Sequence, residues 1–315
     1  MLKIGAVNID TSHPVGFADY MLKGSRGRYA AVYNDSFRDD EQVDAFIEKF
    51  GLDKRCSSLE ELADCVDIGF IHSCNWDNHL KQAMPFVERG KPVFIDKPIV
   101  GSMADCKRLE ELAASGAVIL GSSSVRYCEE VMQFLAVPEQ ECGKIVSVFG
   151  TAGVDEFNYG VHIVEAIGGL VGAGAESCKF TGRAVIDDET CETYFVQFAS
   201  GVTAVYNTSW ATYQPFELVI MTTKTTYQFR VDTGKLYGSL LDRIFDYMET
   251  GCKMASMQDL TESVKIMLAG RVSRENDGKE TALTDIPNDY AGYDGALFAK
   301  SYAAAARDIR RMWGA

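Results

Sequence analysis

The chain has 315 residues, of which 47% are hydrophobic and 24% are charged. This composition is ordinary for a globular protein and excludes disordered, collagen-like and low-complexity chains. A chain of this length usually forms about two domains. The formal net charge of −14 argues against nucleic acid and anionic membrane surfaces as partners, because both need a basic face.

Apolar runs alternate with amphipathic stretches over the first 122 residues. The apolar runs predict strands at Leu2–Val7, Tyr29–Tyr33, Asp67–His72, Pro92–Ile95 and Val118–Leu120. Helices are predicted from Pro14 and over Glu41–Phe50, Ser57–Cys65, Asn78–Glu88 and Ser102–Ala114. Continuous apolar strands separated by helices are typical of a parallel sheet covered on both faces. We therefore predict a doubly wound α/β domain over residues 1–122.

After residue 122 the strands become longer and richer in β-branched and aromatic residues. They are predicted at Ile145–Thr151, Cys178–Val185, Thr190–Ala199, Val202–Trp210, Phe216–Met221 and Thr225–Val231. Helices are predicted at Glu129–Ala136, Gly160–Leu170, Leu236–Thr250, Gln258–Glu275 and Leu297–Arg311. This pattern favours a second domain over residues 123–315, built on a mostly antiparallel sheet.

The cysteines and the first residues indicate the cellular compartment. The nine cysteines form no C-x-x-C pair, and the first residues have no basic signal region. We therefore expect reduced thiols and a cytoplasmic protein. The longest apolar stretch, Val161–Ala175, is interrupted by His162 and Glu165, so it is too polar and too short to span a membrane. No histidine pair has zinc-ligand spacing with a third ligand nearby, and we predict no metal.

The end of the first predicted strand is where a dinucleotide-binding fold holds pyrophosphate. The usual glycine pattern, G-x-G-x-x-G, falls there on Gly5, Val7 and Asp10, of which only the first is glycine. Thr11 and Ser12 supply hydroxyl groups in place of the missing glycine contacts, at the start of a helix whose free N–H groups attract an anion. We predict that these five residues contact the cofactor.

The end of the second predicted strand is where an acidic residue binds the ribose of NAD. Asp35 stands there, and Arg38 follows at a distance that suits a 2′-phosphate. NAD and NADP therefore both remain open. The alternative is that Asp35 caps a turn and Arg38 is a solvated surface residue.

Several short motifs occur in an informative order. They are Gly90–Lys91–Pro92–Val93, Phe94–Ile95–Asp96–Lys97–Pro98, Arg126–Tyr127 and Gly160–Val161–His162. With these motifs the chain resembles the glucose–fructose oxidoreductase / inositol dehydrogenase family (Gfo/Idh/MocA), whose fourth strand ends in Glu-Lys-Pro. The resemblance implies an N-terminal Rossmann domain, a C-terminal α/β domain with an open, mostly antiparallel sheet, and NAD or NADP as cofactor. It also implies a small-molecule substrate, a sugar or polyol, whose hydroxyl is oxidised.

Oxidation of a hydroxyl needs a base that takes the proton and a donor that steadies the oxygen. Lys97, at a strand end, is predicted as the donor and a cofactor contact, and His162 as the base. Asn158 stands four residues before His162, where the family has Asp; if the helix already runs there, the two share a face. Glu165 either partly replaces that Asp or seals the helix to the sheet. A core histidine is the alternative reading of His162.

Other polar residues complete the predicted site. Ser73, Cys74 and Asn75 are expected to line the nicotinamide, and His79 to lie near the adenine or nicotinamide. Arg126, Glu165 and His13 are expected to bind substrate, His13 from the phosphate loop.

Two rival functions remain open beside an NAD(P)-dependent oxidoreductase. The first is a lyase or glycosidase in which bound NAD is reduced and reoxidised within one turnover. The second is a non-catalytic ligand-binding homologue, which the missing glycines and Asn158 favour and which Lys97 and His162 disfavour.

The second sheet carries many aromatic residues, and this predicts an oligomer. They are Tyr194, Phe195, Phe198, Tyr206, Trp210, Tyr227 and Phe229. Because successive side chains of a strand point to opposite faces, one aromatic face would stay uncovered in a monomer. We expect a homodimer or homotetramer that buries this face. The alternative is that residues Ala291–Ala315 fold back over it.

Overall fold

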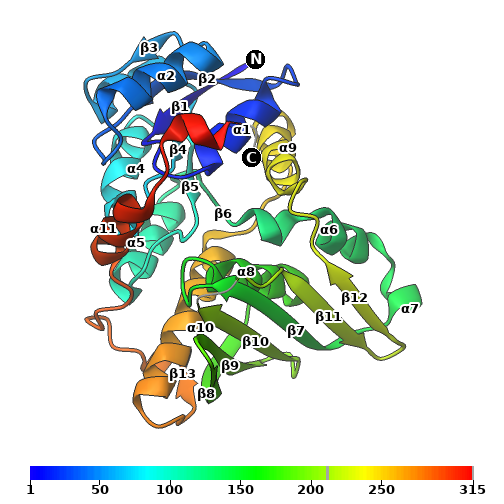
Figure 1. Cartoon of the computed structure of the whole chain (residues 1–315). Helices are drawn as coiled ribbons and strands as arrows, with labels where there is room; N and C mark the ends of the chain where they lie inside the picture. The colour runs from blue at the N-terminus through cyan, green and yellow to red at the C-terminus, as the bar shows by residue number, and fades with distance from the viewer. Residues whose placement is uncertain (211–212, 314–315) are drawn as a thin grey trace.

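The computed structural model describes residues 1–210 and 213–313, which form two sheets joined by a shared hydrophobic core (Figure 1). The first sheet has the strand order β3-β2-β1-β4-β5-β6 and is parallel throughout. Its strands are β1 Leu2–Val7, β2 Gly27–Tyr33, β3 Lys54–Arg55, β4 Ile68–Ile71, β5 Val93–Asp96 and β6 Ile119–Ser122. The predicted doubly wound sheet is confirmed, with β3 as an additional short edge strand.

Helices connect these parallel strands, as the sequence predicts. They are α1 His13–Met21, α2 Asp40–Phe50, α3 Leu59–Cys65, α4 His79–Glu88 and α5 Met103–Ala114, with the short η1 Trp76–Asn78 before α4. Side-chain caps fix several of their starts: Asp39 accepts from the backbone of Gln42 before α2, and Ser58 accepts from that of Glu61 before α3. Strand order reverses between β1 and β4, and ligands of such sheets bind outside the carboxyl ends of the strands at this point.

The second sheet has the order β12-β11-β7-β10-β9-β8-β13, and only the β10–β7 pair is parallel among its described residues. Its strands are β7 Ile145–Val154, β8 Ala175–Ile186, β9 Glu189–Phe198, β10 Thr203–Trp210, β11 Glu217–Thr222, β12 Thr226–Arg230 and β13 Thr281–Ala282. The associated helices are η2 Ser124–Tyr127, α6 Glu129–Ala136, α7 Glu139–Cys142, α8 Gly160–Val171, α9 Leu236–Thr250, α10 Met257–Glu275 and η3 Leu283–Asp285. The predicted mostly antiparallel sheet is confirmed.

The two faces of the second sheet differ in their cover. Helices α8 and α10 pack against strands of this sheet, and the large side chains Tyr194, Phe198 and Tyr206 are fully buried. On the other face, Phe149 pairs in register with Val205 and remains 39% exposed. The structure thus has one covered and one open face.

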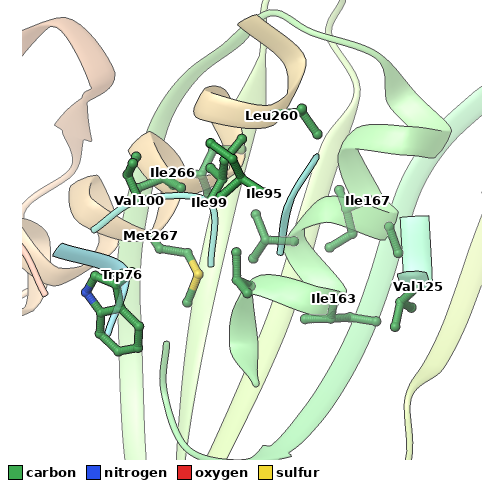
Figure 2. Packing of buried hydrophobic residues seen from close by; sticks show 14 of the residues in the cluster. Trp76, Ile95, Ile99, Val100, Val125, Ile163, Ile167, Leu260, Ile266 and Met267 are labelled. Carbon is green, nitrogen blue, oxygen red and sulfur yellow. The ribbon is translucent and has the colours of Figure 1, made fainter. Parts of the chain in front are cut away.

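Apolar side chains from both sheets meet in one cluster (Figure 2). Ile95, Ile99 and Val100, at and just after β5, gather beside Ile266 of α10 in this view. All four side chains are fully buried. This packing holds the end of β5, and therefore Asp96 and Lys97, against the second sheet.

The predicted C-terminal helix, Leu297–Arg311, is wrong in its extent. The structure has α11 over Gly295–Ala305 and then the short η4 over Ile309–Met312, with an extended break at Ala306. The segment returns to the first sheet, where η4 packs on α2 and α11 on η1 (red in Figure 1). The alternative that residues 291–315 cover the second sheet is therefore wrong for 295–313; residues 314–315 lie outside the described residues. Within residues 1–210 and 213–313, no helix has the length and apolar character needed to cross a membrane.

Candidate active site

The turn after β1 begins at Asn8, which has a left-handed backbone with φ of 62°. Gly5 lies inside β1, and an added Cβ there would come within 3.0 Å of Leu62. Its lack of a side chain therefore serves strand–helix packing. The predicted glycine register was wrong, because it placed Gly5 and the buried Val7 in the turn. Counted from Asn8, the glycine pattern falls on Asn8, Asp10 and His13.

Asn8 replaces the first glycine, since asparagine tolerates the left-handed conformation better than other residues. Its side chain also joins the ends of neighbouring strands: Nδ2 donates to Asp35 Oδ1 at 3.0 Å, and the Asp35 backbone N–H donates to Oδ1 of Asn8 at 2.9 Å. The Asp35 side chain remains exposed at the end of β2. It is thus placed where the sequence predicts a ribose-binding carboxylate.

Asp10 points into the protein and not toward the cleft. It is 1% exposed, and its carboxylate accepts hydrogen bonds from Ser36 Oγ and from the Cys74 backbone N–H, the latter at 2.8 Å. Burial raises the pKa of Asp10, and the two hydrogen bonds oppose that rise. Asp10 therefore ties the turn to the neighbouring strand ends, which leaves Thr11 and Ser12 to face the cleft.

Arg38 is buried and bonded to backbone carbonyl groups. Its guanidinium donates to the carbonyl oxygens of Asp10 and Arg307, each at 2.6 Å, and to Gln42 Oε1 at 2.8 Å. The alternative of a solvated Arg38 is therefore wrong. Two atoms at this edge, Arg38 Nε and Asn34 Oδ1, are buried without a hydrogen-bond partner in the described part of the chain.

Asp96, the last residue of β5, holds two histidines. His13 Nδ1 donates to Asp96 Oδ2 at 2.8 Å, and His72 Nδ1 donates to the same oxygen at 2.9 Å. Burial alone would raise the pKa of Asp96, but the two histidines outweigh it and hold that pKa well below its ordinary value. His72 is fully buried, and burial lowers its pKa. His13 keeps partial exposure, and its Nε2 has no hydrogen-bond partner among residues 1–210 and 213–313.

Lys97 directly follows this carboxylate. Its Nζ donates to Asn158 Oδ1 at 2.9 Å and to the Asn158 carbonyl oxygen at 3.2 Å. Burial lowers the pKa of Lys97, against the opposing effects of Asp96 and Asp155. The predicted pairing of Asn158 with His162 is wrong, because α8 begins only at Gly160 and the Asn158 amide instead holds Lys97.

His162 lies in a different polar group, in the first turn of α8. Its Nδ1 hydrogen-bonds Ser123 Oγ at 2.7 Å, and burial together with the charge of Lys97 holds its pKa well below the ordinary value. Glu165 is 0% exposed and pairs with Arg126 at 3.2 Å. Glu165 also accepts from the Ser122 hydroxyl and the Ser123 backbone. These contacts favour the alternative in which Glu165 anchors α8 to the residues after β6. Because Arg126 and Glu165 are buried against each other, the structure does not support their predicted role in substrate binding.

The predicted residues after β4 divide into two groups. Ser73 and Cys74 line a cavity at the strand ends. Asn75 caps η1 by accepting from the Asp77 backbone at 3.1 Å. His79 is fully buried between the carbonyl oxygens of Ile99 and Ser73, at 3.0 and 2.8 Å. The expected contact of His79 with the cofactor is therefore wrong; it braces the loop that carries Ser73.

Two cavities meet at this edge of the first sheet. The smaller, of 80 Å³, is lined by Thr11, Ser12, His13, His72, Ser73, Cys74, Asp96, Lys97, Asn158, Tyr159, Phe298 and Tyr302. The larger, of 890 Å³, shares Asn158 and Phe298 with it. His13 and Lys97 therefore line the same small cavity, and the neighbouring cavity has the size of a ligand site. His162 lines neither cavity among the described residues.

Sequence reasoning missed some of these residues. Tyr159 lies with its ring centroid 5.6 Å from Lys97 Nζ, and Tyr302 and Phe298 come from the C-terminal segment. Tyr159 is adjacent to the Gly-Val-His motif, which gave a local signal. Nothing in the sequence pattern indicated that residues near 300 return to the first sheet. No group of three or more histidine, cysteine or acidic side chains suited to a metal occurs in residues 1–210 and 213–313.

Comparisons with known proteins agree with this geometry. Residues 4–123 match the model of the Gfo/Idh/MocA family, described as an oxidoreductase family with an NAD-binding Rossmann fold. No curated protein matches the sequence.

Solved structures match over most of the chain. A protein described as a probable dehydrogenase from Thermotoga maritima superposes with a TM-score of 0.77 at 17% identity, over 91% of this chain and 100% of that one. Scyllo-inositol dehydrogenase from Lactobacillus casei, solved with NAD(H) and scyllo-inositol, gives 0.74 at 14% identity, over 90% and 99%. UDP-N-acetylglucosamine 3-dehydrogenase from Acidithiobacillus ferrooxidans gives 0.68 at 12%, over 86% and 98%. Residues 4–123 therefore match an oxidoreductase family with an NAD-binding Rossmann fold, and the solved structures share the fold of the chain as a whole.

Proposed function

We propose that this oxidoreductase transfers a hydride between nicotinamide and a hydroxyl-bearing carbon of a sugar-like or polyol substrate. The observation that carries the proposal is the convergence of Lys97 and the Asp96-bound His13 on one cavity at the carboxyl edge of the parallel sheet. A cation and an oriented imidazole in one small space can serve a single substrate oxygen. Two proteins of similar fold, a scyllo-inositol dehydrogenase and a UDP-N-acetylglucosamine 3-dehydrogenase, are named for substrates of this kind.

The residues at the sheet edge suit a dinucleotide. Asp35 offers an exposed carboxylate at the end of β2, and Asn34 Oδ1 and Arg38 Nε are buried polar atoms without partners beside it. Thr11 and Ser12 present hydroxyls at the start of α1, where free backbone N–H groups favour phosphate. When bound, NAD or NADP would supply the acceptor for the hydride.

Lys97 is the proposed donor to the substrate oxygen. Asn158 holds its ammonium through two contacts at 2.9 and 3.2 Å, which fixes the long side chain at the boundary of the two cavities. A preorganised cation stabilises the negative charge that develops on the oxygen as its proton leaves.

His13 is the proposed base. The hydrogen bond of His13 Nδ1 to Asp96 Oδ2, at 2.8 Å, fixes the orientation of the imidazole. Asp96 and His13 thus form the carboxylate–imidazole hydrogen bond that Asn158 and His162 do not form. His162, which the family resemblance suggests, is the second candidate base, although it lines neither cavity among the described residues.

The 890 Å³ cavity is the proposed substrate chamber. Its lining combines the carboxylates of Asp77, Asp105 and Asp155 with the rings of Trp76 and Trp210. Carboxylates accept hydrogen bonds from hydroxyl groups, and flat rings pack on apolar faces. A ligand with many hydroxyls fits both properties.

Titration calorimetry with NAD and NADP, followed by a polyol and sugar screen monitored by nicotinamide absorbance, tests the proposal. We expect binding of at least one dinucleotide and net reduction with at least one substrate. No binding of either at millimolar concentration would contradict it; tight cofactor binding with substrate turnover but no net reduction would instead favour the redox-cycling lyase or glycosidase. Asp35→Ala is expected to weaken NAD binding, and unchanged affinity would remove Asp35 from the site.

We also propose that the open face of the second sheet forms a homo-oligomer. Phe149 and Met221 are 39% and 46% exposed there, and in-register pairs place Val219, Phe149, Val205 and Phe195 in one apolar row across four strands. Within residues 295–313, α11 packs on η1 and η4 packs on α2, away from this row. Light scattering at micromolar concentration should give a dimer or tetramer, whereas a single 34.7 kDa species would contradict the proposal.

A further inference from the structure

The C-terminal segment, residues 295–313, crosses the carboxyl edge of the first sheet. It begins beside η1, where the Ala296 backbone N–H donates to Asp77 Oδ2 at 3.0 Å and the Phe298 ring lies 4.9 Å from that of Trp76. It ends beside α2, where the Ile309 backbone N–H donates to Gln42 Oε1 at 3.0 Å. The red segment in Figure 1 follows this path in front of β1 and β4.

Between these two attachments the segment lies over the region proposed for the dinucleotide. Tyr302 and Phe298 close the small cavity that Thr11 and Ser12 line. The Tyr302 ring also lies 6.3 Å from that of Phe37, in the loop after β2, and the Arg307 carbonyl accepts from Arg38. Both halves of the predicted cofactor site, at the ends of β1 and β2, are therefore in contact with the chain's own C-terminal segment.

The space that remains is too small for a dinucleotide. The cavity measures 80 Å³, whereas ligand pockets usually measure about 300–1,000 Å³. The polar groups of the edge suit the cofactor, but the volume does not while the segment lies there.

The segment is only lightly attached. Within residues 295–313, only Gly295 and Ile309 are fully buried, and the other side chains are partly or fully exposed. Its links to the first domain are a few single hydrogen bonds, ring contacts, and the apolar packing of Ile309, Met312 and Trp313 at its end. Segments with few buried apolar contacts open at low free-energy cost.

We propose that residues 295–313 form a displaceable cover that competes with NAD(P) for the carboxyl edge of the Rossmann sheet. This inference rests on the proposed function and concerns the regulation of the same site. Arg38 illustrates the exchange: its Nη1 donates to the Arg307 carbonyl while the cover is closed, and this one hydrogen bond is released when the cover leaves. The apparent dissociation constant for the cofactor then equals the intrinsic constant divided by the open fraction.

Ile309→Asp tests the cover in the full-length chain. Ile309 is fully buried against the first domain, so a carboxylate there should detach the segment without changing any residue proposed to bind cofactor or substrate. Ala304→Asp introduces the same carboxylate at an exposed position of the same segment and is the matched control. By calorimetry we expect NAD or NADP to bind Ile309→Asp about tenfold more tightly than wild type, and Ala304→Asp to match wild type.

Amide hydrogen exchange of the wild-type protein, measured with and without cofactor, is a second test that needs no variant. With saturating NAD(P), amides of residues 298–312 should exchange faster, while those of α10 stay unchanged. If wild type binds the cofactor but Ile309→Asp binds it no more tightly, or if binding slows exchange in 298–312, the cover is overturned while the proposed function stands. If neither wild type nor Ile309→Asp binds either dinucleotide at millimolar concentration, the proposed function fails and the cover fails with it.

Discussion

Two polar groups of this protein contain a histidine close to an acidic residue, and they differ in access. The cavity cluster, His13, His72, Asp96 and Lys97, lies at the strand ends and borders open space. The buried cluster, Ser123, Arg126, His162 and Glu165, joins α8 to η2. The residue types are similar, yet only the first presents a partly exposed imidazole and an ammonium to one cavity. Residue type and motif order alone therefore do not separate a catalytic group from a packing group.

The largest expected effect concerns the stability that the buried cluster provides. Arg126→Met removes the cation that pairs with Glu165 at 3.2 Å, where both side chains are buried. A buried carboxylate without its partner is costly, so we expect the free energy of unfolding to fall by about 3–5 kcal/mol. Denaturant unfolding measures this loss.

The exposed pair Arg108–Glu111 provides the control. Arg108→Met should change the free energy of unfolding by less than about 1 kcal/mol, as for other surface ion pairs. Equal losses in the two variants would show that the buried cluster has no special structural role.

The next effect concerns the chemistry of the cavity cluster. Lys97→Ala is expected to lower turnover by about a hundredfold or more, because no other ammonium of the described chain lines the small cavity. Cofactor affinity should stay nearly unchanged, since Lys97 acts on the substrate oxygen. Lys107→Ala, at an exposed position of α5, should behave as wild type. Wild-type turnover in Lys97→Ala would assign Lys97 to structure alone.

A smaller effect is expected in the dependence of turnover on pH. Burial lowers the pKa of Lys97 from its ordinary 10.5, so its protonated form is lost as pH rises through a value below 10.5. Turnover should therefore decline on the alkaline side before an ordinary lysine would deprotonate. Lys97→Arg keeps a cation at all accessible pH values, and its residual turnover should lack this decline. If the turnover of Lys97→Arg declined over the same alkaline pH range as that of the wild type, the titrating group would not be Lys97.

Sequence patterns predicted the elements well where local rules decide. Helices α6 and α9 begin and end at the predicted residues, Glu129–Ala136 and Leu236–Thr250. The short strands β3 and β13 were missed, because two-residue strands depend on their neighbours and carry little pattern of their own.

The site was predicted less completely, for two physical reasons. The predicted position of the turn was wrong because the glycine pattern was aligned on Gly5, which lies inside β1. The residue that adopts the left-handed conformation is Asn8, which is not a glycine. Long-range contacts also escaped prediction: Asp96 with His13 and Lys97 with Asn158 join residues far apart in the chain. The fold alone sets these distances.

The central claim is that His13, and not His162, is the base. The most direct measurement compares turnover of His13→Ala and His162→Ala at saturating cofactor and substrate, alongside denaturant unfolding of both variants. We expect His13→Ala to lose about a hundredfold in turnover at nearly wild-type stability, and His162→Ala to lose mainly stability. A hundredfold loss in His162→Ala, with turnover retained in His13→Ala, would contradict the account and return the base to the start of α8.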